Sequence, residues 1–219
     1  MESIIFIAPP AAGKGTQSDL ISKKYNIPQI SVGDILREEV KNGSELGEEI
    51  EFKMNNGILL DDEFISELIK KRIALPDCNN GYILDGYPRN VNQANIYDEM
   101  LKSINHHLGY VFFLNVPKEE TKKRITGRIS CPKCKTVFSE TFESMKPKQE
   151  GICDHCQTEL VKRIDDNEET YEKRYQTYLD ETEPLINYYK DKDYFYQINA
   201  IEKDVIFKEL CNILDEEVK

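Results

Sequence analysis

The segment Gly-Lys-Gly-Thr at residues 13–16 has the residue types and order of a phosphate-binding loop. In such a loop, consecutive backbone N–H groups point at the phosphates, a lysine reaches the terminal phosphate, and a hydroxyl group can hold magnesium. Lys14 and Thr16 occupy the positions for these last two roles. The sequence therefore predicts a phosphorylated ligand with Mg²⁺ as cofactor, and an ordinary strand-to-helix turn is the alternative.

The loop differs from the usual pattern GxxxxGK[ST] at its first glycine, because Ala8 stands at that position. Ala11 and Ala12 also fill the middle of the loop. An alanine costs about 1–2 kcal/mol where the backbone needs a positive φ. We therefore expect a strained loop if Ala11 or Ala12 adopts that conformation.

Four of the six cysteines form two Cys-x-x-Cys pairs, Cys131 with Cys134 and Cys153 with Cys156. The 18 residues between the pairs are within the spacing of a four-thiolate zinc ribbon. Four protein ligands would close the tetrahedral site, so the predicted zinc is structural. Reduced cysteines without metal are one alternative. A zinc ribbon that binds nucleic acid is another, which the neighbouring lysines favour.

The length and charge of the chain limit the classes of protein to which it can belong. A chain of 219 residues can bury one substantial core with an insertion or two. Its 39% hydrophobic and 32% charged residues are typical of a folded chain rather than a disordered one. A net charge of -11 repels nucleic acid and anionic membranes. A phosphorylated ligand must therefore be held by clustered arginines or by magnesium, which favours a small nucleotide.

The compartment is expected to be the cytoplasm. No stretch approaches the roughly 20 apolar residues of a membrane span. Glu2 stands where a signal peptide would be positively charged. Cys78 and Cys211 are expected to be reduced residues that pack in the core. We expect neither a nucleic acid nor a membrane as partner.

Strands and helices alternate along the chain. Apolar runs predict strands at residues 3–7, 81–85, 110–116 and 194–198. Helical spacing or capping residues predict helices at 35–43, 44–57, 61–75, 118–127 and 167–189. Three further helices are expected: one that begins after residue 13, one that ends near residue 100, and one at the carboxyl terminus. This order predicts an α/β fold, with a parallel sheet between helices and ligands at the carboxyl ends of the strands. The helical pattern stops between about 130 and 160, so the cysteine segment is an insertion into that core.

Several segments together resemble the adenylate kinase family, in its bacterial form with a long zinc-stabilised lid. PPAAGKGTQ, ISVGDILR, DGYPRNVNQA, ITGR, the cysteine pairs and KRIDDNEETYEKR occur in the family's order and spacing over essentially the whole chain. The resemblance implies reversible phosphoryl transfer from magnesium ATP to AMP, giving two ADP, by a monomer. It also implies three domains: a three-layer P-loop core (1–30, 61–126 and 165–219), a helical AMP-binding insertion (31–60) and a zinc-ribbon lid (127–164).

The resemblance also implies roles for individual residues. Phosphoryl transfer needs positioning and charge neutralisation more than covalent chemistry, so a ring of arginines is the expected machinery. Catalytic roles fall to Lys14, Asp85, Arg89, Arg128, Arg163 and Arg174. The implied ATP-binding residues are Ala11, Ala12, Gly13, Lys14, Gly15, Thr16, Arg124, Arg128, Val137, Phe138 and Ile201. The implied AMP-binding residues are Val32, Arg37, Ile58, Leu59, Leu60, Gly86, Tyr87, Pro88, Arg89, Gln93, Arg163 and Arg174.

Within these sets, the resemblance implies that Gln93 recognises the adenine of AMP and that Arg124 lies on the adenine of ATP. It also implies that Asp85 holds the water molecules bound to magnesium. Four positions depart from the family. Ala8 and Ala11 stand where glycine is usual in the phosphate loop. Val32 stands where threonine is frequent beside the AMP base, and Ala200 where glycine is usual near the ATP adenine.

Three alternatives to this interpretation remain open. The chain could be a kinase for CMP or UMP, or a protein that binds ATP and zinc without catalysis. Arg124, Arg163 and Arg174 could also be ordinary solvated surface charges.

Overall fold

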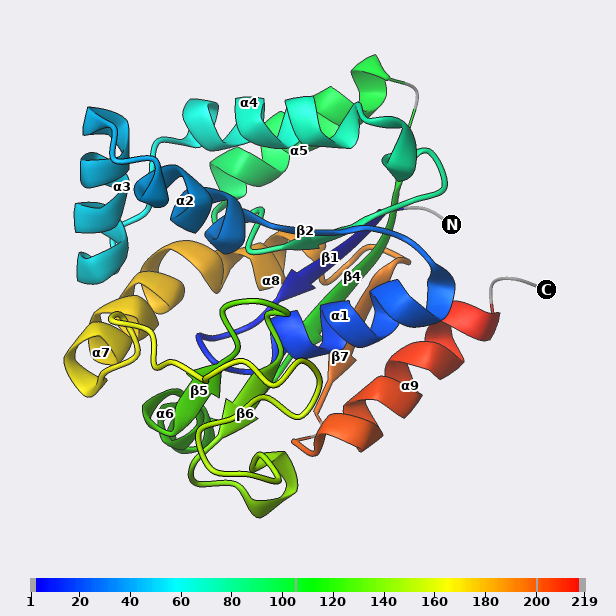
Figure 1. Ribbon diagram of the computed structural model, residues 1–219. Coiled ribbons are helices and arrows are strands. Elements are labelled where there is room, and N and C mark those ends of the chain that lie inside the picture. The colour runs from blue at the N-terminus through cyan, green and yellow to red at the C-terminus, as the bar shows by residue number, and fades with distance from the viewer. Residues whose placement is uncertain (1–2, 105, 200, 217–219) are drawn as a thin grey trace.

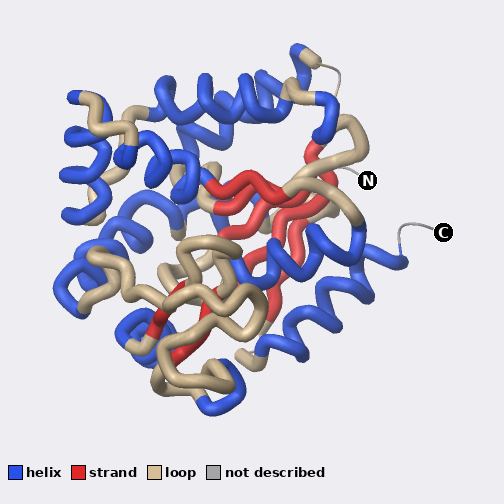
Figure 2. The backbone as a smooth tube through the Cα atoms, in the orientation of Figure 1, coloured by secondary structure: helices blue, strands red, loops and turns tan. Residues whose placement is uncertain are grey.

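A computed structural model describes residues 3–104, 106–199 and 201–216. Its centre is a parallel five-stranded sheet with the strand order β2-β3-β1-β4-β7, covered by helices on both faces (Figure 1). Figure 2 shows these strands as one twisted sheet, with the loops of the cysteine insertion beside it. The predicted α/β fold with a parallel sheet between helices is confirmed. Glu2 and Ala200, which entered the sequence analysis, lie outside the described residues.

The central strand β1, Ser3–Ile7, is buried along its whole length. It pairs with β3, Ile83–Asp85, on one side and with β4, Leu108–Leu114, on the other. The edge strands are β2, Gln29–Ser31, and β7, Phe195–Ile198. Because all five strands are parallel, their carboxyl ends lie at one edge of the sheet. Strand β3 is shorter than the expected 81–85, and a glycine with φ 103 precedes it at residue 81.

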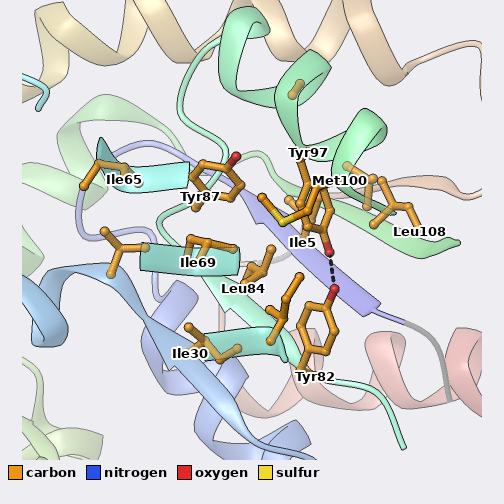
Figure 3. Close-up of a cluster of buried hydrophobic side chains, with 14 of the residues drawn as sticks. Ile5, Ile30, Ile65, Ile69, Tyr82, Leu84, Tyr87, Tyr97, Met100 and Leu108 are labelled. Carbon is orange, nitrogen blue, oxygen red and sulfur yellow. Dashed lines mark hydrogen bonds between the residues drawn. The ribbon is translucent and has the colours of Figure 1, made fainter. Parts of the chain in front are cut away.

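Alternate residues of the strands pack against different helices, as a sheet covered on both faces requires. Ile4 and Phe6 of β1 face α1, Lys14–Tyr25, and α9, Lys203–Glu216. Ile5 and Ile7 face α4, Asp62–Ile73, α5, Val91–Ser103, and α8, Pro184–Tyr189. Figure 3 shows the second cluster, where the Tyr82 and Tyr97 hydroxyls are hydrogen-bonded at 2.8 Å. Within the described ranges, no helix is long and apolar enough to cross a membrane.

Residues 31–60 form a pair of helices beside the sheet. Helix α2, Val32–Lys41, begins three residues before the expected position, because the Ser31 side chain accepts a hydrogen bond from Asp34 N and caps it. Helix α3, Glu45–Asn56, begins after the predicted cap Ser44 and ends at Gly57, whose φ is 70. The pair is linked to α7, Glu168–Thr177, by a 2.9 Å hydrogen bond from Thr177 Oγ1 to the Gly57 carbonyl.

The insertion that contains the cysteines follows α6, Lys118–Thr126. Its regular structure is a short antiparallel hairpin of β5, Arg128–Ser130, and β6, Val137–Ser139, and a 3₁₀ turn at Glu143–Met145. The predicted absence of an α-helix between residues 130 and 160 is confirmed. A core of its own unites Ile129, Phe138, Cys131 and Cys153.

The single helix expected at 167–189 is interrupted. Helix α7 is followed by a π turn, Tyr178–Thr182, and then by α8. The Glu183 N–H donates to the Tyr178 carbonyl at 2.8 Å, a five-residue step, and Pro184 has no N–H with which to continue an α-helical ladder. The turn directs Thr182 Oγ1 to the carbonyl of Arg89 at 2.7 Å.

Candidate functional site

The phosphate-binding loop connects the carboxyl end of β1 to the first turn of α1. Gly13 precedes the helix with φ 104, and Lys14 is the first helical residue. Ala11 has φ 61, so the strain expected for an alanine at a glycine-like position applies to Ala11, whereas Ala12 has no positive φ. Backbone N–H groups at the start of α1 are thereby available to a phosphate.

Asp85 lies beside this loop because β3 neighbours β1 and the register pairs Phe6 with Asp85. A Cβ on Gly15 would lie 3.2 Å from Asp85 Oδ2, so the backbone of α1 approaches the carboxylate closely. Gln29 Nε2 donates to the same oxygen at 3.3 Å. The Asp85 carboxylate and the Thr16 hydroxyl are oxygen ligands of the kind that Mg²⁺ prefers, and they fit a magnesium site at the phosphate loop.

Three cations of the site have lowered pKa values. Burial lowers the pKa of Lys14 from its ordinary 10.5 to about 8; Asp85 opposes this shift and Arg89 adds to it. Burial, together with the charges of Arg174 and Arg37, lowers the pKa of Arg89. Burial and the charges of Arg128 and Arg37 lower the pKa of Arg163 to about 10. Arg37 affects the pKa of both Arg89 and Arg163, and Arg89 affects the pKa of Lys14, so charges from distant segments of the chain influence one another here.

Three aspartates hold three of the arginines. Asp34 Oδ1 accepts from Arg37 Nη2 at 2.6 Å. Asp166 binds Arg128 through two hydrogen bonds, and the side chain of Asp166 is fully buried. Asp165 binds Arg174. Although burial opposes the shift, Arg174 holds the pKa of Asp165 below its usual value. Among the described residues, Arg163 has no such carboxylate partner.

Arg124 joins the phosphate loop to the segment before α9. Its Nη1 donates to the Ala12 carbonyl at 3.0 Å, and its Nη2 donates to the Ile201 carbonyl at 2.8 Å. Glu120 accepts from its Nε at 3.1 Å. Arg124 therefore lies against the phosphate loop, and three hydrogen bonds hold its guanidinium there. Its neighbour Lys122 behaves as an ordinary surface charge, since it pairs with Glu168 and Glu172.

The Gln93 side chain is buried, with 2% of the residue exposed. Its Oε1 accepts from the Arg89 backbone N–H at 2.8 Å, and its Nε2 donates to Asp62 Oδ1 at 2.8 Å. Val32 is also buried. An open cavity of about 590 Å³ lies next to this network, and its lining includes Asp62 and Asn90.

The other residues that family position implies fall into three groups. Ile58, Leu59 and Leu60 line the 590 Å³ cavity. Gly86, Tyr87 and Pro88 follow Asp85, but the Tyr87 side chain points into the core, where its hydroxyl bonds to Ser66 at 2.9 Å. Val137 and Phe138 belong to β6, and the Phe138 ring is buried inside the insertion.

Sequence reasoning missed Asp62, Gln29 and Thr182, which hold Gln93, Asp85 and the Arg89 backbone in place. Gln29 gives a weak signal, because it is the polar residue of the apolar stretch 27–31. Asp62 gives none, because an acidic residue in the first turn of the helix predicted at 61–75 already has the role of opposing the helix dipole. No local pattern indicates the partner of Thr182.

The four sulfur atoms of the cysteine pairs lie within 4.8 Å of one another. Cys131 Sγ is 3.3 Å from Cys156 Sγ, and Cys134 Sγ is 3.5 Å from Cys153 Sγ. Tetrahedral zinc with Zn–S bonds of about 2.3 Å requires sulfur separations of roughly 3.8 Å. The donor set therefore fits Zn²⁺.

The two cysteine pairs have the same backbone structure. In each, the N–H of the first cysteine donates to a carbonyl five residues later, and the N–H four residues later returns to the first cysteine. The returning residues, Lys135 and Gln157, both have positive φ, at 63 and 58. His155 is exposed and lies outside the sulfur cluster. All six cysteines are free thiols, and the expected burial of Cys78 and Cys211 is confirmed.

Comparison with known proteins places these features in a family. The adenylate kinase family model matches residues 6–194. The adenylate kinase of Archaeoglobus fulgidus is 45% identical over 216 residues, which cover 98% of each chain. The adenylate kinases of Clostridium botulinum strain Loch Maree and Acetivibrio thermocellus are each 44% identical over 212 residues, 96% of this chain and 97% of theirs. With its phosphate loop, its clustered arginines and its parallel sheet, this chain belongs to the adenylate kinase family.

Proposed function

We propose that the protein catalyses reversible transfer of the γ-phosphoryl group of magnesium ATP to AMP, giving two ADP. The observation that carries this proposal is an excess of cations at the carboxyl edge of the sheet. Six cations, Lys14, Arg37, Arg89, Arg128, Arg163 and Arg174, face four carboxylates, Asp34, Asp85, Asp165 and Asp166. The lowered pKa values of Lys14 and Arg163 reflect the free-energy cost of burying these positive charges near one another. A polyanionic ligand would reduce that cost. The site can therefore attract phosphates even though the net charge of the whole chain is negative.

The cations divide between the two nucleotides. Lys14 and the N–H groups of the phosphate loop bind the phosphates of ATP, and Arg124 meets its adenine. Arg37 and Arg89 clamp the phosphate of AMP, a bidentate task for which guanidinium is better suited than ammonium. Arg128, Arg163 and Arg174 then neutralise the group in transfer. Aspartates hold Arg37, Arg128 and Arg174 in place through ion pairs. These arginines therefore need little reorganisation when negative charge develops on the phosphoryl group in transfer.

Thr16 and Asp85 would hold Mg²⁺, which neutralises charge on the ATP phosphates when it is bound. The chain's own part is positioning. Gln29 orients the Asp85 carboxylate through its 3.3 Å hydrogen bond. A side chain at Gly15 would displace that carboxylate, because a Cβ there would lie 3.2 Å from Asp85 Oδ2.

Two segments would close over the nucleotides, residues 127–164 as a lid and residues 31–60 as the AMP-binding domain. Arg128 and Arg163 stand at the two ends of the lid, so lid closure delivers both charges to the transferring group. In support, Lys135 Nζ of the lid lies 3.7 Å from Glu38 Oε1 of α2. Closure excludes water, and water would otherwise accept the phosphoryl group.

A zinc ion bound by the four cysteines would give the lid its rigidity. Three buried or half-buried apolar residues, with two buried cysteines and one half-buried cysteine, are too few to stabilise some 38 residues by packing alone. The four sulfur ligands close the site, so zinc here would serve the structure and not the chemistry.

The experiment that tests the proposal is ADP formation from magnesium ATP on zinc-loaded protein, with AMP, CMP, UMP and GMP offered separately. We expect strong preference for AMP. Preference for CMP or UMP would overturn the choice of acceptor. Failure of all four acceptors would indicate a protein that binds ATP without transferring phosphate.

A further inference from the structure

The carboxylate of Asp62 receives hydrogen bonds from three side-chain amides. Gln93 Nε2 donates to Oδ1 at 2.8 Å, Asn90 Nδ2 donates to Oδ1 at 3.0 Å, and Asn92 Nδ2 donates to Oδ2 at 2.8 Å. Asp62 is the first residue of α4, and the three amides belong to the start of α5. Asn90 also caps α5 by accepting from the Gln93 N–H at 2.8 Å. The arrangement ties both ends of the Gln93 residue, its backbone and its amide, to fixed partners.

The orientation of the Gln93 amide follows from the chemistry of its neighbours. Its Oε1 faces the backbone N–H of Arg89, which can only donate, and its Nε2 faces the carboxylate of Asp62, which accepts. A flipped amide would place nitrogen against the N–H and oxygen against the carboxylate. Both contacts would then be repulsive in a side chain that is 2% exposed, where no water compensates.

An amide held in this way has one hydrogen on Nε2 and one lone pair on Oε1 left for a ligand. It therefore presents a donor beside an acceptor in a fixed order. The edge of adenine offers an acceptor at N1 beside a donor at the 6-amino group. Hypoxanthine and guanine offer the reverse, a donor at N1 beside an acceptor at the 6-oxo group. For a base whose phosphate is already clamped, only one of these two orders matches.

We propose that Asp62 is a positioning residue that holds Gln93 in the orientation complementary to adenine, and that it thereby sets the preference for 6-amino over 6-oxo purine monophosphates. This inference rests on the proposed function, in which Gln93 reads the base of AMP. In this role Asp62 acts through the Gln93 amide, although Asp62 also lines the 590 Å³ cavity. A site built to pair one donor and one acceptor rejects the reversed pattern strongly, because both of its buried polar groups would be left unpaired.

The test compares AMP with IMP, which differs from AMP only at this edge of the base. In Asp62→Asn, the new side chain can donate as well as accept, so it no longer discriminates between the two orientations of the Gln93 amide, and only the Arg89 backbone N–H still does. We expect the ratio of kcat/KM for AMP to kcat/KM for IMP to fall by about tenfold. The change should come from a higher KM for AMP, with kcat altered by less than about twofold. Asp62→Ala, which removes the acceptor entirely, should lower the same ratio.

Glu67→Gln is the matched control, because it removes the same charge from another residue of α4, and Glu67 is exposed and does not line the cavity. Its ratio should stay within about twofold of the wild-type value. An unchanged ratio in both Asp62 variants would overturn the inference. An equal loss of kcat/KM with AMP and with IMP would also overturn it, because a purely structural role of Asp62 produces that result. Wild-type protein that fails to use AMP would instead overturn the proposed function.

Discussion

At the scale of single residues, the site combines strain with unfavourable burial of charge. Lys14 is held as a cation among other cations, and Ala11 occupies a conformation that glycine adopts more easily. Both features reduce the free energy of unfolding, and both lie in the loop that binds phosphate. Such costs are expected where a protein is organised for its ligand rather than for its own stability.

The burial of Lys14 predicts a conflict between stability and activity. Its pKa falls from 10.5 in an ordinary environment to about 8, so between those pH values the unfolded chain binds more protons than the folded one. The contribution of Lys14 to the unfolding free energy therefore rises with pH across this window, and below pH 8 the buried cation is destabilising.

Replacing this lysine by an apolar side chain removes the buried charge. Lys14→Met should raise the unfolding free energy at pH 7 by about 2 kcal/mol. It should lower phosphoryl transfer by at least ~100-fold. Urea unfolding and an assay of ADP formation measure the two effects. A variant less stable than wild type at pH 7 would show that the charge is already compensated in the free protein.

The strain at Ala11 can be relieved without changing the charge of the site. Ala11→Gly removes about 1–2 kcal/mol of conformational strain and adds about 0.4–1 kcal/mol of unfolded-chain entropy. A net stabilisation of about 0.5–1 kcal/mol should appear in urea unfolding. Ala12→Gly is the control, since φ of Ala12 is not positive and the same change there should destabilise. Equal effects at both positions would contradict the assignment of strain to Ala11.

At the scale of elements, α3 ends against α7 at Gly57. This glycine has φ 70, and a Cβ there would lie 3.1 Å from Arg174 N. The adjoining hydrogen bond from Thr177 makes the contact continuous with the helix that carries Arg174. The end of α3 is thereby coupled to the position of Arg174, an arginine that we propose takes part in phosphoryl transfer.

Gly57→Ala should therefore lower both stability and kcat. We expect a loss of about 2 kcal/mol, from positive-φ strain and from displacement of the Arg174 backbone. Gly43→Ala provides a matched control, because its φ is 66 but no atom lies within 4 Å of its would-be Cβ. It should cost about 1 kcal/mol and leave kcat unchanged. If both variants reduced kcat equally, flexibility of residues 31–60 would matter more than the contact with α7.

At the scale of the whole molecule, the cysteine insertion, which we propose to be the lid, has a core separate from the two clusters that flank the sheet. Its small core contains two of the four sulfur ligands, whereas the clusters on the sheet contain none of them. Metal binding and packing of this insertion would therefore form one cooperative unit, and the central sheet should fold without them.

Zinc removal should accordingly loosen the lid and spare the core. Chelation, or Cys153→Ser, should make residues 127–164 sensitive to limited proteolysis and lower the melting temperature. The far-ultraviolet circular dichroism of the sheet and helices should change little. Cys78→Ser is the control, because that buried cysteine lies outside the metal cluster. Loss of the entire fold on chelation would contradict the independence of lid and core.

Local patterns in the sequence predicted much of this fold. The central strand, the phosphate loop, the cap Ser44 and the four clustered cysteines were all predictable, because each depends on residues near one another in the sequence. The interruption of the helix expected at 167–189 was not predicted. Pro184 alone does not determine a π turn, which also satisfies a hydrogen bond from Thr182 to the distant Arg89.

The sequence by itself determined which chemical groups this protein has: one phosphate loop, a set of arginines, four thiols with the spacing of metal ligands, and the order of strands and helices. Only the tertiary structure decided how they are paired. Asp166 binds Arg128 and not its neighbour Arg163, and Asp62 orients Gln93 across 31 residues of chain. These choices depend on contacts between distant segments and on burial, which raises the cost of every unpaired polar group. The spacing of residues along the chain predicts neither the contacts between distant segments nor the burial of their polar groups.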